Sequence, residues 1–113
     1  MPLPRAVDLL SALAQGSRLA VFRLLVKAGP DGLPAGTIAR EVGVRPNTLS
    51  THLAILEQAG LVTARREGRS VIYAADYGAM RALLGFLVDD CCGGQPDICA
   101  PLAGLIPACG AEA

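Results

Sequence analysis

Residues 35–61 constrain the fold of this chain most strongly, because two short segments with helical spacing of apolar residues flank a turn at Gly43. Residues 34–42 predict the first helix. Its inward-facing residues are expected to be Ile38, Ala39 and Val42. Gly43 suits the left-handed conformation that closes a helix. A second helix is predicted to begin at Pro46 or Asn47, two registers that the sequence leaves open. This order is typical of a helix-turn-helix, whose second helix enters the major groove of DNA.

The second of these helices has two faces of different chemistry. At about 100° per residue, three leucines share one apolar side, and short polar side chains gather on the opposite side. The apolar stripe consists of Leu49, Leu53 and Leu56, and the outer side consists of Asn47, Thr51, Ala54 and Gln58, flanked by Thr48 and Ser50. A helix face that is merely solvated usually carries Lys and Glu. The outer side therefore favours hydrogen bonds to base edges and phosphates.

His52, the only histidine of the chain, lies at the edge of that outer side. Its direction from the helix axis is about 60° from the centre of the leucine stripe. We therefore expect a half-buried imidazole that forms a hydrogen bond with the backbone or with a DNA phosphate. Base reading, metal binding and catalysis are less favoured, because no second ligand or catalytic partner lies near it in the sequence.

A basic hairpin is predicted after the helix-turn-helix. Residues 61–67 and 70–74 favour strands, and Gly68 and Arg69 lie between them. Such a hairpin is typical of the wing of winged-helix proteins, which meets phosphates or the minor groove. The alternative is a generic solvated hairpin. The residues predicted to contact DNA are Arg45, Asn47, Thr48, Ser50, Thr51, His52, Arg65, Arg66 and Arg69.

Two helices are predicted before the helix-turn-helix. The first covers residues 5–15, and Ser17 is a plausible N-cap for a second helix that ends at Ala28. A cluster of glycine, proline and aspartate at residues 29–32 predicts a turn. Apolar residues cover most of the circumference of the second helix, so we expect it to be deeply buried.

The last predicted helix begins at Asp76 or Tyr77 and reaches the region of residues 89–90. Its apolar residues cover more than one core-facing stripe, so a second face is expected to pack against another subunit. A symmetric dimer places two recognition helices on a palindromic site. The predicted architecture is mainly α with a β-hairpin wing, in the order α-α-α-α-β-β-α. Residues 1–90 are expected to form the dimerising DNA-binding domain, and residues 91–113 a tail.

The 113-residue chain has no formal net charge, but its charges are unevenly distributed. Residues 1–75 carry nine basic and five acidic side chains, whereas residues 76–113 carry one basic and five acidic side chains. A basic body with an acidic tail can present a positive face to DNA. No apolar run approaches the roughly 20 residues that span a bilayer. Asp8 interrupts the first apolar stretch, and no basic cluster precedes it, which argues against a signal peptide. We therefore expect a cytoplasmic protein. No nucleophile–base pair or phosphate loop indicates an enzyme.

Residues 15–88 resemble the ArsR/SmtB family of metal- and metalloid-responsive bacterial repressors. The resemblance rests on residues 13–25 (LAQGSRLAVFRLL), 49–62 (LSTHLAILEQAGLV) and 65–73 (RREGRSVIY). It implies a homodimeric winged helix that blocks a promoter by binding double-stranded operator DNA and leaves when its inducer binds. The family's best-known arsenic site is a Cys-x-Cys motif on the helix before the recognition helix. That site is missing here, because residues 37–42 contain no cysteine. The last helix also lacks the His and Asp/Glu arrangement of the family's zinc site.

All four cysteines lie in the last 23 residues, at positions Cys91, Cys92, Cys99 and Cys109. Clustered cysteines in a cytosolic protein bind metal or sense redox state more often than they form a disulfide framework. This tail resembles a branch of arsenic repressors whose ligands follow the last helix, which implies Cys91, Cys92 and Cys99 as the ligands here. Arsenite, As(III), and antimonite, Sb(III), each accept three thiolates, and thiolates select soft ions.

The geometry of the cysteine tail allows three ligands, and it also leaves other readings open. Gly93 and Gly94 are suited to end the helix and free the backbone, so that the chain can loop back and bring Cys99 alongside. The alternatives are methylarsenite or another soft ion, a zinc site with Cys109 as a weak fourth candidate, a disulfide redox switch, and cysteines with a structural role. The competing functions are a winged-helix thiol redox sensor and a thiol-rich protein that sequesters or carries metal.

Overall fold

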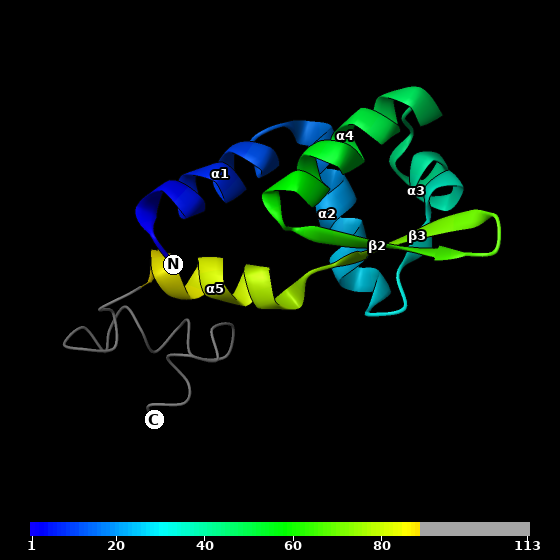
Figure 1. Cartoon of the computed structure of the whole chain (residues 1–113). Helices are drawn as coiled ribbons and strands as arrows, with labels where there is room; N and C mark the ends of the chain where they lie inside the picture. Colours follow the sequence, from blue (N-terminus) through cyan, green and yellow to red (C-terminus); the bar gives the residue numbers. More distant parts are fainter. Residues whose placement is uncertain (89–113) are drawn as a thin grey trace.

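Five helices and three short strands follow one another along residues 1–88, the part of the chain that this computed structural model describes (Figure 1). The elements are α1 (Leu3–Leu13), α2 (Gly16–Ala28), β1 (Leu33–Pro34), α3 (Ala35–Val42), α4 (Pro46–Ala59), β2 (Val62–Glu67), β3 (Ser70–Ala75) and α5 (Tyr77–Leu87). The predicted winged helix-turn-helix is confirmed, with one additional strand. The predicted tail at 91–113 and the predicted helix end at residues 89–90 lie outside the described residues.

The sheet has three antiparallel strands in the order β1-β3-β2. Glu67 pairs with Ser70, so Gly68 and Arg69 form the predicted two-residue turn, and Gly68 has a φ of 61°. The strand that the sequence did not predict, β1, has only two residues, and it pairs with β3 at the edge of the sheet. Proline at its second position is tolerated there because an edge strand has a free side.

Two helix boundaries differ from the prediction. Ser17 does not cap α2, because the helix already begins at Gly16 and the side chain of Gln15 accepts a hydrogen bond from the Arg18 backbone N–H at 2.9 Å. Gln15 is in the extended conformation of an N-cap, so its longer side chain performs the role expected of serine. Helix α1 begins earlier than residue 5, and it ends at Leu13 because Ala14 leaves the helical conformation with a ψ of 45°.

The hydrophobic core lies between the helices and the strands, and all five helices contribute buried side chains to it. Its largest fully buried side chains are Leu9, Val21, Leu25, Ile38, Leu49, Leu53, Leu56 and Leu61. Full burial of such a side chain stabilises a fold by about 1.5–3 kcal/mol. The expected deep burial of α2 holds for Val21, Phe22 and Leu25 but not for all of its apolar residues. Leu19 is 44% exposed and faces an apolar hollow of about 390 Å³ that Met80 and Leu84 of α5 also line.

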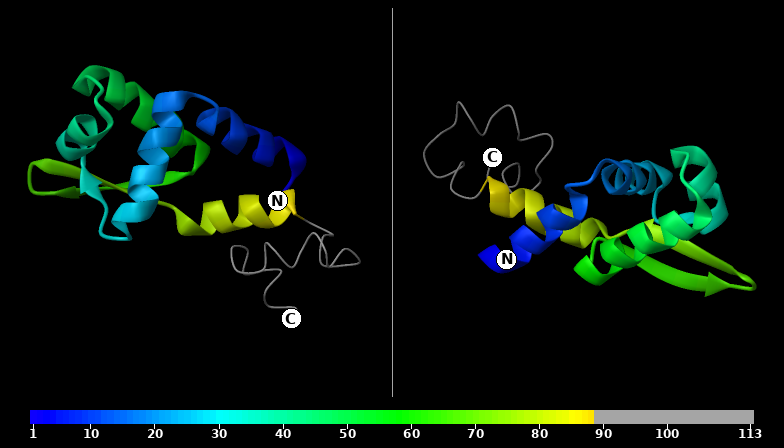
Figure 2. Two further views of the ribbon diagram at one scale, coloured as in Figure 1. Left: turned by 180° about the vertical axis from the view of Figure 1, so that it is seen from behind. Right: turned by 90° about the horizontal axis from the view of Figure 1, so that it is seen from above.

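The start of α1 and the end of α5 come together at the end of the molecule opposite the hairpin (Figures 1 and 2). Ala6, Leu9 and Ala12 of α1 are buried. A second apolar stripe on the same helix stays exposed, formed by Leu3 (64%), Val7 (50%) and Leu10 (41%). Leu87 at the end of α5 is also exposed. Contiguous apolar surface of this kind is typical of a subunit interface.

The apolar helices α1 and α2 meet at a sharp bend of 99°. The Arg18 guanidinium fixes this bend, because its Nε donates a hydrogen bond to the Ala12 carbonyl at 2.7 Å. Among the helices of residues 1–88, none is by itself long and apolar enough to cross a membrane, and only this bent pair reaches that length and composition together.

Candidate nucleic-acid interface

The turn between α3 and α4 is built from a closing glycine and an opening proline. Gly43 has a φ of 78°, and its N–H donates to the Ala39 carbonyl at 2.9 Å, which ends α3. Pro46 occupies the first turn of α4, where its missing N–H costs nothing, and Arg45 is the N-cap residue. The structure thus selects the Pro46 register of the two that the sequence left open.

The predicted two faces of α4 are confirmed. The leucine stripe is buried, whereas Asn47, Thr48, Ser50 and Thr51 are all exposed. Two of these polar side chains make local bonds. Asn47 Oδ1 accepts a hydrogen bond from the Thr48 N–H at 3.0 Å, and Ser50 Oγ donates one to the Pro46 carbonyl at 3.1 Å. These bonds hold polar groups on the first two turns of α4, which are the turns that contact base edges in a helix-turn-helix.

His52 is half-buried at the edge of this face, as expected. Its Nδ1 atom is buried and has no hydrogen-bond partner within the described part of the chain. The expected bond from the imidazole to the backbone is therefore not formed at this nitrogen. His52 lies beside the polar groups of α4 rather than among them.

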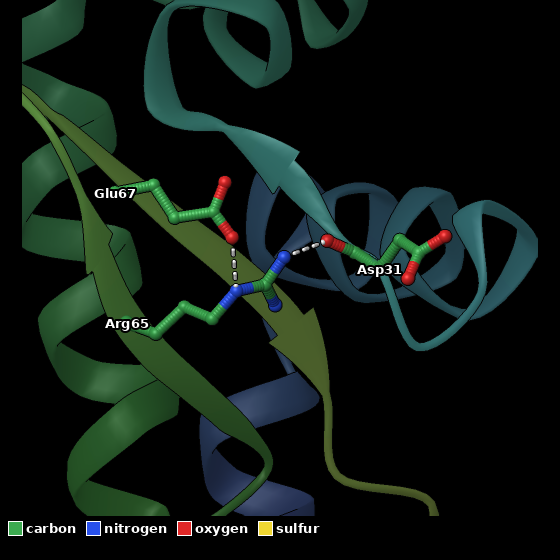
Figure 3. A network of polar contacts seen from close by, with 3 residues as sticks. All are labelled: Asp31, Arg65 and Glu67. Atoms are coloured by element: carbon green, nitrogen blue, oxygen red, sulfur yellow. Dashed lines mark hydrogen bonds and ion pairs between the residues drawn. The ribbon is translucent and has the colours of Figure 1, made fainter.

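The three hairpin arginines do not share one role, and Arg65 is the one held by other groups of the protein (Figure 3). The Arg65 Nε donates to Glu67 Oε2 at 2.7 Å, and its terminal nitrogen donates to the backbone carbonyl of Asp31, also at 2.7 Å. Asp31 lies in the turn between α2 and β1, so Arg65 ties the hairpin to the body of the molecule. Arg66 and Arg69 are exposed near the tip. These two are thus the arginines best placed to meet a phosphate.

The hairpin and the first half of α4 lie at the same end of the molecule, away from the free end of α5 (Figures 1 and 2). Arg45, at the start of α4, is exposed at this end. Arg40 of α3 is exposed as well, 3.4 Å from the Thr37 hydroxyl, and sequence reasoning missed it as a candidate phosphate contact. The sequence feature that could have identified Arg40 is its position in the last turn of α3. Residues 1–88 carry ten basic and six acidic side chains, a balance that suits a polyanionic partner.

The cysteines predicted to bind the inducer, Cys91, Cys92, Cys99 and the weaker candidate Cys109, lie outside the described residues. Within residues 1–88, no group of three or more His, Cys, Asp or Glu side chains is placed to hold a metal ion. The exposed polar side chains of α4 and the exposed arginines described above are of the kinds that contact nucleic acid.

Comparison with known proteins identifies relatives of this helix-turn-helix fold. A family model described as a helix-turn-helix domain matches residues 13–65. The transcriptional activator HlyU of Vibrio cholerae is 31% identical over 83 residues, which are 74% of this chain and 74% of HlyU. The solved structure of HlyU is similar to this fold with a TM-score of 0.64 and 30% identity, over 75% of this chain and 89% of that chain.

Two further solved structures are similar. The homodimeric winged helix-turn-helix DNA-binding domain Mb0332 of Mycobacterium bovis, a possible ArsR-family transcriptional regulator, has a TM-score of 0.64 and 32% identity, over 78% of this chain and 82% of that chain. A possible transcriptional regulator for arsenical resistance has a TM-score of 0.63 and 30% identity, over 73% of this chain and 81% of that chain. These relatives are transcriptional regulators with DNA-binding folds and not enzymes.

Proposed function

The chain belongs to the ArsR/SmtB-type family of winged helix-turn-helix transcriptional regulators, and we propose that it represses transcription by binding operator DNA as a homodimer. One observation carries the proposal. The face of α4 opposite its buried leucines exposes Asn47, Thr48, Ser50 and Thr51, next to the exposed Arg45. Short amides and hydroxyls can form hydrogen bonds to base edges, while arginines bind phosphates.

The wing and α4 have different roles in binding DNA. Helix α4 supplies the base contacts, and Arg45, Arg66 and Arg69 supply phosphate contacts that set position and add affinity. Arg65 orients the wing through its bonds to Glu67 and Asp31. Such a protein acts where operator DNA lies, in the cytoplasm.

The dimer is supported by the exposed apolar stripe of α1 and by the homodimeric state of the related Mycobacterium bovis domain. A two-fold axis beside α1 and α5 places the outer faces of two α4 helices on the same side of the dimer. Such a pair binds two half-sites that lie one turn of DNA apart, about 34–36 Å. A palindromic operator is the expected target.

The proposed inducer is trivalent arsenic or antimony, bound by Cys91, Cys92 and Cys99. Three clustered thiolates suit soft, thiophilic ions. The similarity to a possible regulator of arsenical resistance points the same way. On this proposal the protein controls a metalloid-resistance operon, and arsenite, antimonite or methylarsenite releases it from DNA.

Release requires that the inducer prefer the state that binds DNA more weakly. The cysteines follow α5, and α5 packs beside α1 at the end that carries the exposed apolar stripe. Reshaping this end changes how two subunits meet, and so changes the spacing of the two α4 helices. Coupling of about 1–3 kcal/mol, the usual range, shifts DNA affinity about 5- to 150-fold.

The decisive experiment starts from a complex of the protein with the DNA upstream of its own gene. Candidate inducers are titrated into this complex, and fluorescence anisotropy monitors release of the DNA. Arsenite, antimonite, methylarsenite, zinc and cadmium are added separately. We expect tight binding to one footprinted site and release by trivalent arsenic or antimony. Only weak, strongly salt-dependent association would instead indicate a metal-sequestering or carrier protein. Release by an oxidant and recovery with a thiol reductant, without arsenic, would indicate a redox sensor.

Single serine substitutions test the ligand set. Cys91→Ser, Cys92→Ser and Cys99→Ser are each expected to keep DNA affinity and lose release by arsenite. Cys109→Ser is the matched control and is expected to respond as the unsubstituted protein does. Normal release of all three ligand variants would contradict the proposed inducer site.

A further inference from the structure

Arg5 of α1 reaches across to the far end of the recognition helix. It is half-buried, and its Nη1 donates a hydrogen bond to the carbonyl of Ala59, the last residue of α4. The last carbonyls of a helix have no donor within the helix, and they carry partial negative charge. The Arg5 guanidinium therefore supplies both a donor and a compensating charge. This contact joins residues 54 positions apart in the chain.

The backbone after α4 passes close to the Arg5 guanidinium at Gly60. Gly60 has a φ of 90°, and the Leu61 N–H donates to the Leu56 carbonyl at 3.0 Å, which closes the helix. A Cβ atom at position 60 would clash with the Arg5 guanidinium. The positive φ favours glycine here, and a Cβ atom at this position would force the Arg5 guanidinium to shift away from Ala59. The contact borders a cleft of about 420 Å³ between α1 and α4.

The same helix, α1, carries the outward apolar stripe of Leu3, Val7 and Leu10. One side of α1 therefore offers a surface for a second subunit, while Arg5 on another side holds the end of α4. Building on the proposed repressor function, we propose that Arg5 is a positioning residue. It fixes α4 to the dimer helix and so sets the spacing at which the two recognition helices meet their half-sites.

The test compares Arg5→Met with Arg23→Met as full-length proteins. Methionine keeps an apolar side chain and removes the donors, and Arg23 is an exposed arginine of α2 outside the α1–α4 cleft, so both variants lose one positive charge. Affinity is measured for the footprinted operator and for versions with half-site spacing changed by one base pair. We expect Arg5→Met to lose about 5- to 30-fold in affinity at the native spacing, within the usual coupling range. Its preference for that spacing should also weaken.

A purely structural role of Arg5 would lower affinity at all spacings equally and leave the preference unchanged. That result, or behaviour equal to that of Arg23→Met, would overturn the proposal. Arg5→Lys, which keeps the charge and a donor, is expected to restore most of the spacing preference. It also serves if the methionine variant does not fold.

Amide hydrogen exchange in the DNA-free protein gives a second readout. The amides of Gly60 and Leu61 should exchange faster in Arg5→Met than in Arg23→Met, because the last turn of α4 loses its anchor. Equal exchange in the two variants would overturn the proposed anchoring. Failure of the unsubstituted protein to bind any upstream DNA would contradict the proposed function instead, and this exchange comparison would still decide whether Arg5 holds α4.

Discussion

The two elements that face DNA, α4 and the wing, are held in place by different physical means. Helix α4 is anchored by Leu49, Leu53 and Leu56, which are at most 2% exposed. The outer part of the wing is tied to the body by Arg65, which is 46% exposed and donates to the Asp31 carbonyl, while Glu67 on the same strand, 57% exposed, pairs with the Arg65 guanidinium. Burial of one leucine contributes about 1.5–3 kcal/mol, whereas an exposed ion pair contributes about 0–1 kcal/mol.

This difference matches what each element has to do. Hydrogen bonds to base edges depend strictly on direction, so the groups that make them need a rigid support. Phosphate contacts carry no direct sequence information, and a long arginine side chain can follow a small movement of its strand. A firmly packed helix and a hairpin whose outer part is exposed therefore suit specificity and affinity, respectively.

The largest expected effect comes from removing the anchor of α4. Leu53→Ala leaves a cavity in the core and should lower the free energy of unfolding by about 2–5 kcal/mol. Thermal or denaturant unfolding followed by circular dichroism measures the loss. Ala54→Ser, on the exposed side of the same helix, is the control and should change stability little. Equal unfolding midpoints for the two variants would refute the idea that buried leucines hold α4.

Substitution on the outer face should affect recognition and not stability. Thr51→Ala is expected to reduce affinity for the operator about 5- to 150-fold, the range for one lost base contact. Affinity for unrelated DNA should stay the same. Gln58→Ala, in the last turn of α4, is the control, because the N-terminal residues of a recognition helix contact the bases. An equal loss on operator and unrelated DNA would show that Thr51 contacts the backbone only.

The division between α4 and the wing was only partly predictable from sequence. The helices, the turn at Gly43 and the hairpin turn at Gly68 follow from local patterns, namely apolar periodicity and glycine at positive φ. Strand β1 was not predicted, because two residues show no periodicity and form a strand only by pairing with β3. The roles of Arg65 and Arg5 were not predicted, because each donates to a backbone carbonyl that is distant in the chain. Every residue offers such a carbonyl, so no pattern in the sequence marks it.

A phosphate contact from the wing should be visible in the dependence of binding on salt. Arg66→Gln is expected to lower affinity several-fold on all DNA sequences and to reduce the slope of log affinity against log salt by about 0.9. Titrations at four or more salt concentrations measure this slope. Arg23→Gln, on α2, should leave it unchanged. A slope equal to that of the unsubstituted protein would mean that Arg66 does not meet a phosphate.

The smallest effect is expected at Arg65, which ties the wing to the body of the molecule. Arg65→Gln removes the bonds to Glu67 and to the Asp31 carbonyl, and since these groups are exposed, the loss of binding energy should be about 1 kcal/mol or less. The salt slope should stay constant, because on this view Arg65 positions the wing and does not neutralise a phosphate. Amides at Gly68 and Arg69 should exchange faster as the hairpin moves more freely. Asp31→Asn is a sharp control, because it keeps the backbone carbonyl that Arg65 uses. A slope reduced as much as in Arg66→Gln would place Arg65 on DNA and make the wing a surface of three equivalent arginines.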